Sequence, residues 1–222
     1  MKRKTKGKLA IFDTFKTKDQ DLTGEAKRQR SIITILGSNV NPAERTRTGI
    51  SQKIAKKQKI TWKNIYSGIF RDLDEILLPM GIAEENGRLP LKRGPKALQE
   101  KGIPYYHLTK KGILVGLAIN GIENMSSQLK EFFAKSKPEE KEFEKIISKF
   151  MTTSPTFTYS IFQKYVKAFC EDKINELLPF DLSKLKDISD ENLITQKELV
   201  LAFGKLSNQE KKEAIVFLEK IA

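Results

Sequence analysis

Apolar side chains recur at helical spacing along most of this chain after residue 24, and residues 82–108 interrupt the pattern. The clearest helix begins at Thr61, where a threonine suits the N-cap, and ends before Pro79 and Gly81. A chain patterned in this way is expected to be mainly α. The positions of this helix that we expect to face the core are Trp62, Ile65, Tyr66, Ile69, Phe70, Leu73, Ile76 and Leu77.

Two shorter helices are predicted before it, at residues 25–36 and 49–58. A pair of strands follows it, at residues 82–85 and 104–108. Asn86-Gly87 is a turn signal, and residues 88–102 are irregular and basic. Thr109 is placed to cap a further helix that reaches Ala118.

The second half is predicted to be almost entirely helical. Its apolar residues are too numerous to pack only on the first half, so we expect a separate helical domain. The predicted helices cover residues 123–135, a segment opened by a Ser136–Glu139 capping box, residues 155–178, and two short helices opened by Thr195–Glu198 and Ser207–Glu210.

Positive charge is concentrated in the first half of the chain. Residues 1–111 hold 25 lysines and arginines against 11 acidic residues, whereas residues 112–222 hold 16 against 17. The net charge of +13 therefore comes from the first half alone. Such an asymmetry indicates a basic binding module for a polyanion, joined to a neutral module with another role. Nucleic acid is the commonest such partner, and an anionic membrane surface is the main competitor.

Several classes of function lack the residues that they need. No apolar run approaches the ~20 residues of a membrane span, and no signal-peptide pattern follows the basic N-terminus. We therefore expect a soluble, intracellular protein. The chain has one cysteine, Cys170, which we expect to be a buried structural thiol, and one histidine, His107, in the second strand. These are too few for a thiolate or imidazole zinc site. No paired carboxylate, Walker-type loop, G-x-S-x-G or HExxH motif stands out either, so we expect no metal, cofactor or catalytic residue.

One local motif, together with the order of the predicted elements, carries a resemblance. The motif is Tyr106-His107-Leu108-Thr109-Lys110-Lys111-Gly112, at the end of the second strand. It resembles the Tyr-x-Leu-Thr-x-Lys-Gly stretch of winged helix-turn-helix regulators, and the resemblance covers residues 25–120. It implies that the third helix enters the major groove of DNA and that the loop between the strands is a wing.

The resemblance and the charge distribution together define the candidate DNA contacts. Lys63, Asn64, Ser67 and Arg71 on the third helix are expected to face the groove, and most of the other cations are expected to bind the backbone phosphates. The full set is Lys53, Lys56, Lys57, Lys59, Thr61, Lys63, Asn64, Ser67, Arg71, Arg88, Lys92, Arg93, Lys96, Lys110 and Lys111.

The sequence therefore predicts three parts: a basic flexible arm at residues 1–24, a winged helix-turn-helix with a small two-stranded wing at residues 25–120, and a helical domain at residues 121–222. The last part is expected to form a homodimer or to bind a protein partner. The predicted function is non-enzymatic binding of double-stranded DNA by a cytoplasmic, nucleoid-associated transcriptional regulator. A replication, partition or chromatin-architectural protein and an RNA-binding winged protein remain alternatives.

Overall fold

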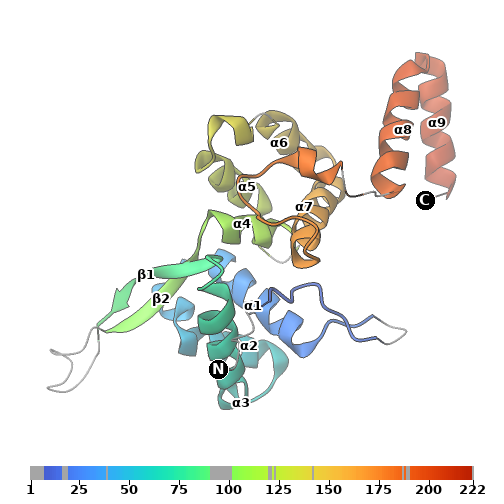
Figure 1. Cartoon of the computed structure of the whole chain (residues 1–222). Coiled ribbons are helices and arrows are strands. Elements are labelled where there is room, and N and C mark those ends of the chain that lie inside the picture. Colours follow the sequence, from blue (N-terminus) through green and yellow to red (C-terminus); the bar gives the residue numbers. More distant parts are fainter. Residues whose placement is uncertain are drawn as a thin grey trace, which may run out of the picture. The chain divides into compact units, whose positions relative to one another are not determined.

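The computed structural model describes residues 8–16, 20–38, 40–90, 102–119, 122, 124–141, 143–186, 188 and 191–221. Within these ranges the chain forms nine α-helices and one two-stranded antiparallel sheet (Figure 1). The prediction of a mainly α chain with a small sheet and a helical C-terminal part is confirmed. The contacts divide the chain into two compact units, Met1–Leu182 and Ser183–Ala222, so the first unit continues beyond residue 120.

The first unit is built around α1 (Gly24–Ser38), whose Ile32 and Ile33 are fully buried. Thr23 begins this helix by accepting a hydrogen bond from the amide of Ala26. Contacts of α1 reach α2, α3, α4 and β2, so this helix ties the early helices to the sheet. The elements of the unit that follow α1 are α2 (Arg47–Gln58), α3 (Trp62–Arg71), β1 (Ala83–Leu89), β2 (Ile103–Leu108), α4 (Lys110–Leu117), α5 (Met125–Ala134), α6 (Glu144–Thr153) and α7 (Pro155–Cys170).

Part of the predicted N-terminal arm belongs to the core. Leu9, Ala10 and Ile11 are buried, and the amide of Ala10 donates to the buried side chain of Gln29 over 2.8 Å. The expectation of a flexible arm is therefore wrong for this stretch. The apolar Leu-Ala-Ile triplet stands among lysines, and its burial depends on a surface of α1 that sequence periodicity does not reveal.

The long third helix of the sequence prediction is interrupted. Its α-helical part, α3, ends at Arg71 and continues as a π-helical turn, η2 (Asp72–Leu77). Four positions of the predicted stripe are buried, Ile69, Leu73, Ile76 and Leu77, and the three in the first two turns of α3 are half-buried. Phe70 is exposed instead of lying in the core. The Arg47 guanidinium lies 5.1 Å from the centre of its ring and covers part of it. Thr61 occupies the N-cap position of α3, yet its side chain makes no capping hydrogen bond.

The strands β1 and β2 pair in antiparallel fashion, from Ala83↔Leu108 at one end to Leu89↔Ile103 at the other. The predicted turn at Asn86-Gly87 is wrong, because β1 continues through these residues to Leu89. The pairing shifts between Glu85 and Gly87, so the glycine marks a β-bulge and not the hairpin turn. An isolated bridge between Thr46 and Tyr105 also connects the start of α2 to β2.

The motif at residues 106–112 joins the sheet to α4. Tyr106 is buried, whereas His107 faces the other side of the hairpin and lies 3.0 Å from Glu84. The Thr109 hydroxyl accepts from the amide of Gly112 and donates to the carbonyl of Gly81, so one side chain caps α4 and binds the turn that leads into β1. A Cβ at Gly112 would lie 2.0 Å from the Ile82 carbonyl oxygen. Only glycine fits this close approach.

Three helix starts or ends in the second half differ from the sequence prediction. Ser136 donates to the Phe132 carbonyl at the end of α5 and opens no helix, because a 3-10 turn, η4 (Pro138–Lys141), follows it. The helix α7 ends at Cys170, eight residues before the predicted end. Thr195 lies inside a helix that has already begun at Glu191.

The second unit holds two helices, α8 (Glu191–Lys205) and α9 (Asn208–Ile221). The predicted capping box at the start of α9 is confirmed. The Ser207 amide donates to the Glu210 carboxylate over 2.8 Å, and the Glu210 amide donates back to the Ser207 hydroxyl over 3.4 Å.

Replacing Gly112 by alanine is expected to destabilise the protein by about 3 kcal/mol, because the new methyl group overlaps the Ile82 carbonyl oxygen. The free energy of unfolding in urea measures this cost. Gly24→Ala is the matched control, since its Cβ would meet only Arg28 at 3.8 Å, and its effect should stay within about 0.5 kcal/mol. Equal stability of the two variants would contradict the steric role of Gly112.

Candidate nucleic-acid interface

Four lysines surround the turn between α2 and α3. Lys56 and Lys57 belong to the last turn of α2, Lys59 is its left-handed C-cap with φ of 57°, and Lys63 lies in the first turn of α3. All four are exposed, and none of them forms an ion pair with the part of the chain that the structure describes. The fold therefore leaves these predicted contact residues available to an external anion.

The exposed face of α3 continues from this turn. Asn64 and Ser67 are exposed, as the sequence predicts, and they line a shallow depression of about 430 Å³. Arg71 lies at the same depression. Arg28 also lines it and comes from α1, so sequence reasoning missed this residue. The sequence pattern placed Asp72 on the polar face of the third helix, and this placement is wrong because Asp72 is fully buried, so no sequence signal pointed to a cationic partner on α1.

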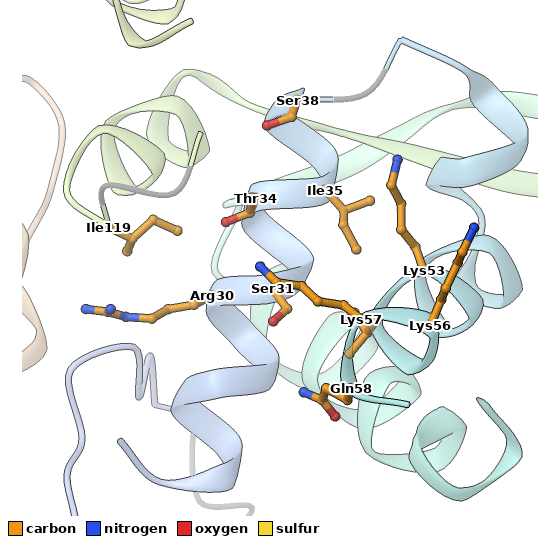
Figure 2. Close-up of a pocket in the computed structure, with 11 residues that line it drawn as sticks. Arg30, Ser31, Thr34, Ile35, Ser38, Lys53, Lys56, Lys57, Gln58 and Ile119 are labelled. Carbon is orange, nitrogen blue, oxygen red and sulfur yellow. The ribbon is translucent and has the colours of Figure 1, made fainter. Parts of the chain in front are cut away.

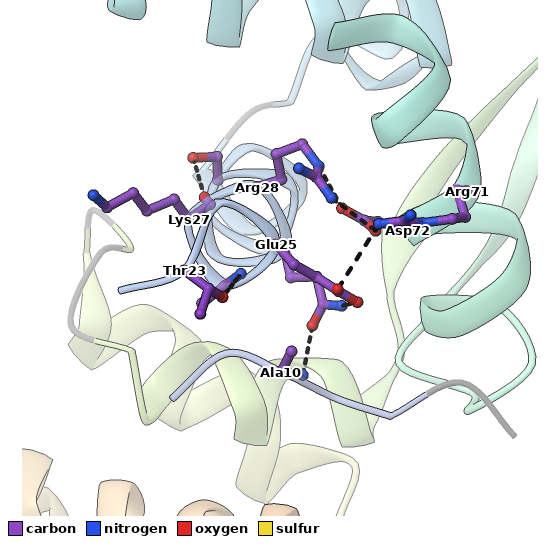
Figure 3. A network of polar contacts seen from close by, with 10 residues as sticks. Ala10, Thr23, Glu25, Lys27, Arg28, Arg71 and Asp72 are labelled. Carbon is purple, nitrogen blue, oxygen red and sulfur yellow. Dashed lines mark hydrogen bonds and ion pairs between the residues drawn. The ribbon is translucent and has the colours of Figure 1, made fainter. Parts of the chain in front are cut away.

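Arg71 does not project freely from this face. Figure 3 shows Arg28 and Arg71 converging on the carboxylate of Asp72. Arg28 donates through Nε over 2.8 Å, whereas Arg71 approaches Asp72 at 3.3 Å and Glu25 at 3.8 Å. Asp72 is fully buried, and half of the Arg71 side chain is exposed. Arg71, which the sequence predicts to contact the major groove of DNA, therefore already pairs with two carboxylates of its own chain.

A second basic surface lies between α1 and α2, in a groove of about 600 Å³ (Figure 2). Lys56 and Lys57 also line this groove, and Lys53 and Arg30 join them. Lys53 pairs with Glu44 over 2.6 Å on the exposed surface. Arg30, which the sequence analysis did not select, donates through Nε to the Ile11 carbonyl over 2.7 Å. The α1 side of the groove also carries the hydroxyl side chains of Ser31, Thr34 and Ser38.

The predicted wing contributes one described contact residue. Arg88 forms a two-pronged pair with Glu85, at 2.6 and 3.0 Å, and it also donates to the Gly102 carbonyl. Lys92, Arg93 and Lys96 lie outside the described residues.

Lys110 and Lys111 have intramolecular partners and do not join the lysines of the α2–α3 turn. Lys110 pairs with the buried carboxylate of Glu140 and lies over the ring of Phe132. Lys111 donates to the Met80 carbonyl over 3.1 Å. Burial alone would raise the pKa of Glu140, but hydrogen bonds from Lys110 and from the amides of Phe180 and Lys137 hold that pKa below its usual value. Lys110 therefore neutralises the buried carboxylate of Glu140 in the same compact unit.

The single cysteine of the chain, Cys170, is buried. Burial raises the pKa of the Cys170 thiol to about 12, so this group stays protonated at neutral pH. No group of three histidine, cysteine or acidic side chains that could hold a metal ion is found among the described residues. Over the same residues, no helix combines the length and apolar character that a bilayer crossing requires.

Comparison of the chain with protein-family models, curated proteins and solved structures finds no match.

The two arginines at Asp72 are expected to differ in their effect on stability. Arg28→Met leaves a buried carboxylate without its closest partner and should lower the free energy of unfolding by about 3 kcal/mol. Arg71→Met removes a half-exposed side chain and should cost less than about 1 kcal/mol. Urea unfolding at neutral pH measures both, and the opposite order would show that Arg71 is the partner that holds Asp72.

Proposed function

We propose that this chain binds duplex DNA through a winged helix-turn-helix and acts as a transcriptional regulator without enzymatic activity. The observation that carries the proposal is the set of four exposed lysines at the α2–α3 turn, beside the exposed polar face of α3. Exposed cations without internal partners can displace counterions from DNA phosphates, which is the main source of affinity for DNA.

The order of elements supports this proposal. Three helices precede an antiparallel hairpin, and the Thr109 cap leads from the hairpin into α4, as the resemblance over residues 25–120 implies. In this arrangement α3 is the recognition helix, with Lys63, Asn64 and Ser67 facing the major groove. Lys56, Lys57 and Lys59 bind the adjacent phosphates, and Arg71 serves mainly to hold Asp72.

The proposed surface is narrower than the set of residues selected from the sequence. Lys110 and Lys111 are excluded, since Lys110 neutralises Glu140 and Lys111 binds a main-chain carbonyl. Arg88 can reach DNA only by leaving Glu85 or by sharing its guanidinium. Among the described residues no acid competes for the lysines of the α2–α3 turn, so we expect them to dominate the salt dependence of binding.

Selection of bound sequences from random DNA duplexes tests the regulatory role. A regulator enriches one sequence, because side chains of α3 read base edges. Equal binding of all duplexes would instead identify an architectural or replication protein. Preference for a structured RNA competitor would identify an RNA-binding protein and would reject the proposal.

Replacing Lys57 and Lys63 by glutamate is expected to weaken duplex binding by about tenfold or more and to reduce the slope of log affinity against log salt by about 2. Fluorescence anisotropy with a labelled duplex at several salt concentrations measures both effects. Both side chains are exposed, so the helix content should not change.

The matched control is the double change Lys145→Glu and Lys149→Glu in α6, two exposed lysines outside the proposed surface. It alters the net charge by the same amount and should leave most of the affinity intact. An equal loss in both variants would mean that binding follows total charge. Unchanged affinity in the Lys57 and Lys63 variant would place the DNA surface elsewhere.

A further inference from the structure

The second compact unit, Ser183–Ala222, exposes an unusual amount of apolar surface. None of the described side chains of α8 or α9 is buried. Eight of the fifteen exposed large apolar residues found in the described part of the chain lie on these two helices. They are Ile194, Leu199, Val200, Leu201, Ile215, Val216, Phe217 and Leu218.

The sequences of α8 and α9 explain why the helical hairpin that these two helices form cannot bury this surface by itself. Each helix contains an unbroken apolar run, 199–203 in α8 and 214–218 in α9. Five consecutive residues at 100° intervals point around the whole circumference of a helix. One neighbouring helix covers only one side, and a helix that is apolar all round is normally buried. The unit is also at the size, about 40 residues, below which association is usually needed for stability.

Exposed apolar side chains elsewhere in the described chain are fewer and more scattered. Five of the other seven lie on separate segments, and one of these, Phe70, is covered in part by Arg47; Phe143 and Ile146 lie three residues apart at the start of α6. A partner surface equally rich in apolar groups is present on a second copy of the hairpin itself.

Charge favours the same occupant. Residues 183–222 contain seven lysines and seven acidic residues, in contrast to the net charge of +13 of the whole chain. A neutral hairpin neither attracts a polyanion nor repels a copy of itself. The helix α8 carries Glu191 in its first turn and Lys205 in its last turn, so two antiparallel copies bring opposite charges together.

We propose that the hairpin formed by α8 and α9 is a self-association element that pairs with the same hairpin of a second chain. The four helices then bury the two apolar runs in a common core, as helical bundles do. A two-fold axis through this bundle makes the two copies contribute identical surfaces. The proposal concerns residues 183–222 only and holds whether or not the first unit binds DNA.

The test is the mass of the full chain in solution, measured by light scattering during gel filtration without nucleic acid. The wild-type protein is expected at twice the 25.4 kDa of one chain. The variant with Val200→Glu and Phe217→Glu places a charge on each exposed apolar run and should have the mass of one chain. The control variant, Gln196→Glu with Asn208→Glu, adds one negative charge to each helix at exposed polar positions and should stay at two chains.

A second variant guards against unfolding of the hairpin by the glutamates. Val200→Thr with Val216→Thr keeps the shape of both side chains, and the added hydroxyls should raise the dissociation constant of the dimer by at least about tenfold. A wild-type mass of one chain would overturn the proposal. A glutamate variant that keeps its helix content and remains a dimer would also overturn it.

Discussion

The ion pair between the partly exposed Arg28 and the fully buried Asp72 fixes how the third helix lies against the first. Asp72 is fully buried at the start of the π turn, where an unpaired carboxylate would be costly. Arg28 meets it from α1 with a charge-assisted hydrogen bond of 2.8 Å. The exposed face of α3 and the α2–α3 turn therefore occupy one defined position, and every functional statement about Lys63, Asn64 and Ser67 depends on that position.

Arginines and lysines have different roles in the first unit. Arg28 and Arg47 bind the carboxylates of Asp72 and Asp74, and Arg47 also lies over the rings of Phe70 and Tyr106. A planar guanidinium suits such contacts, because it combines several fixed donors with a weakly hydrated face. The lysines of the α2–α3 turn keep their ammonium groups in water instead. The excess positive charge therefore reaches the surface mainly through lysine.

The two units present opposite kinds of surface. The first unit buries a core around α1 and presents charge, which suits a long-range and salt-dependent partner such as DNA. The second unit is neutral and presents apolar side chains, which suit a close and specific partner. If both proposals hold, the dimer carries two DNA-binding surfaces. Once one surface is bound, the other meets the same DNA at a high effective concentration, which raises the total affinity.

The sequence by itself determined the features that depend on near neighbours along the chain. Helical periodicity located α1, α2 and the third helix, alternation placed Tyr106 and His107 on opposite faces, and Thr109 identified the start of α4. Only the tertiary structure decided which partner each side chain meets. It placed Leu9 in the core, turned Lys110 toward Glu140 and held Arg71 beside Asp72. The physical reason is that periodicity and capping act over a few residues, whereas burial and ion pairing join residues that are distant in sequence and become neighbours only after the chain has folded.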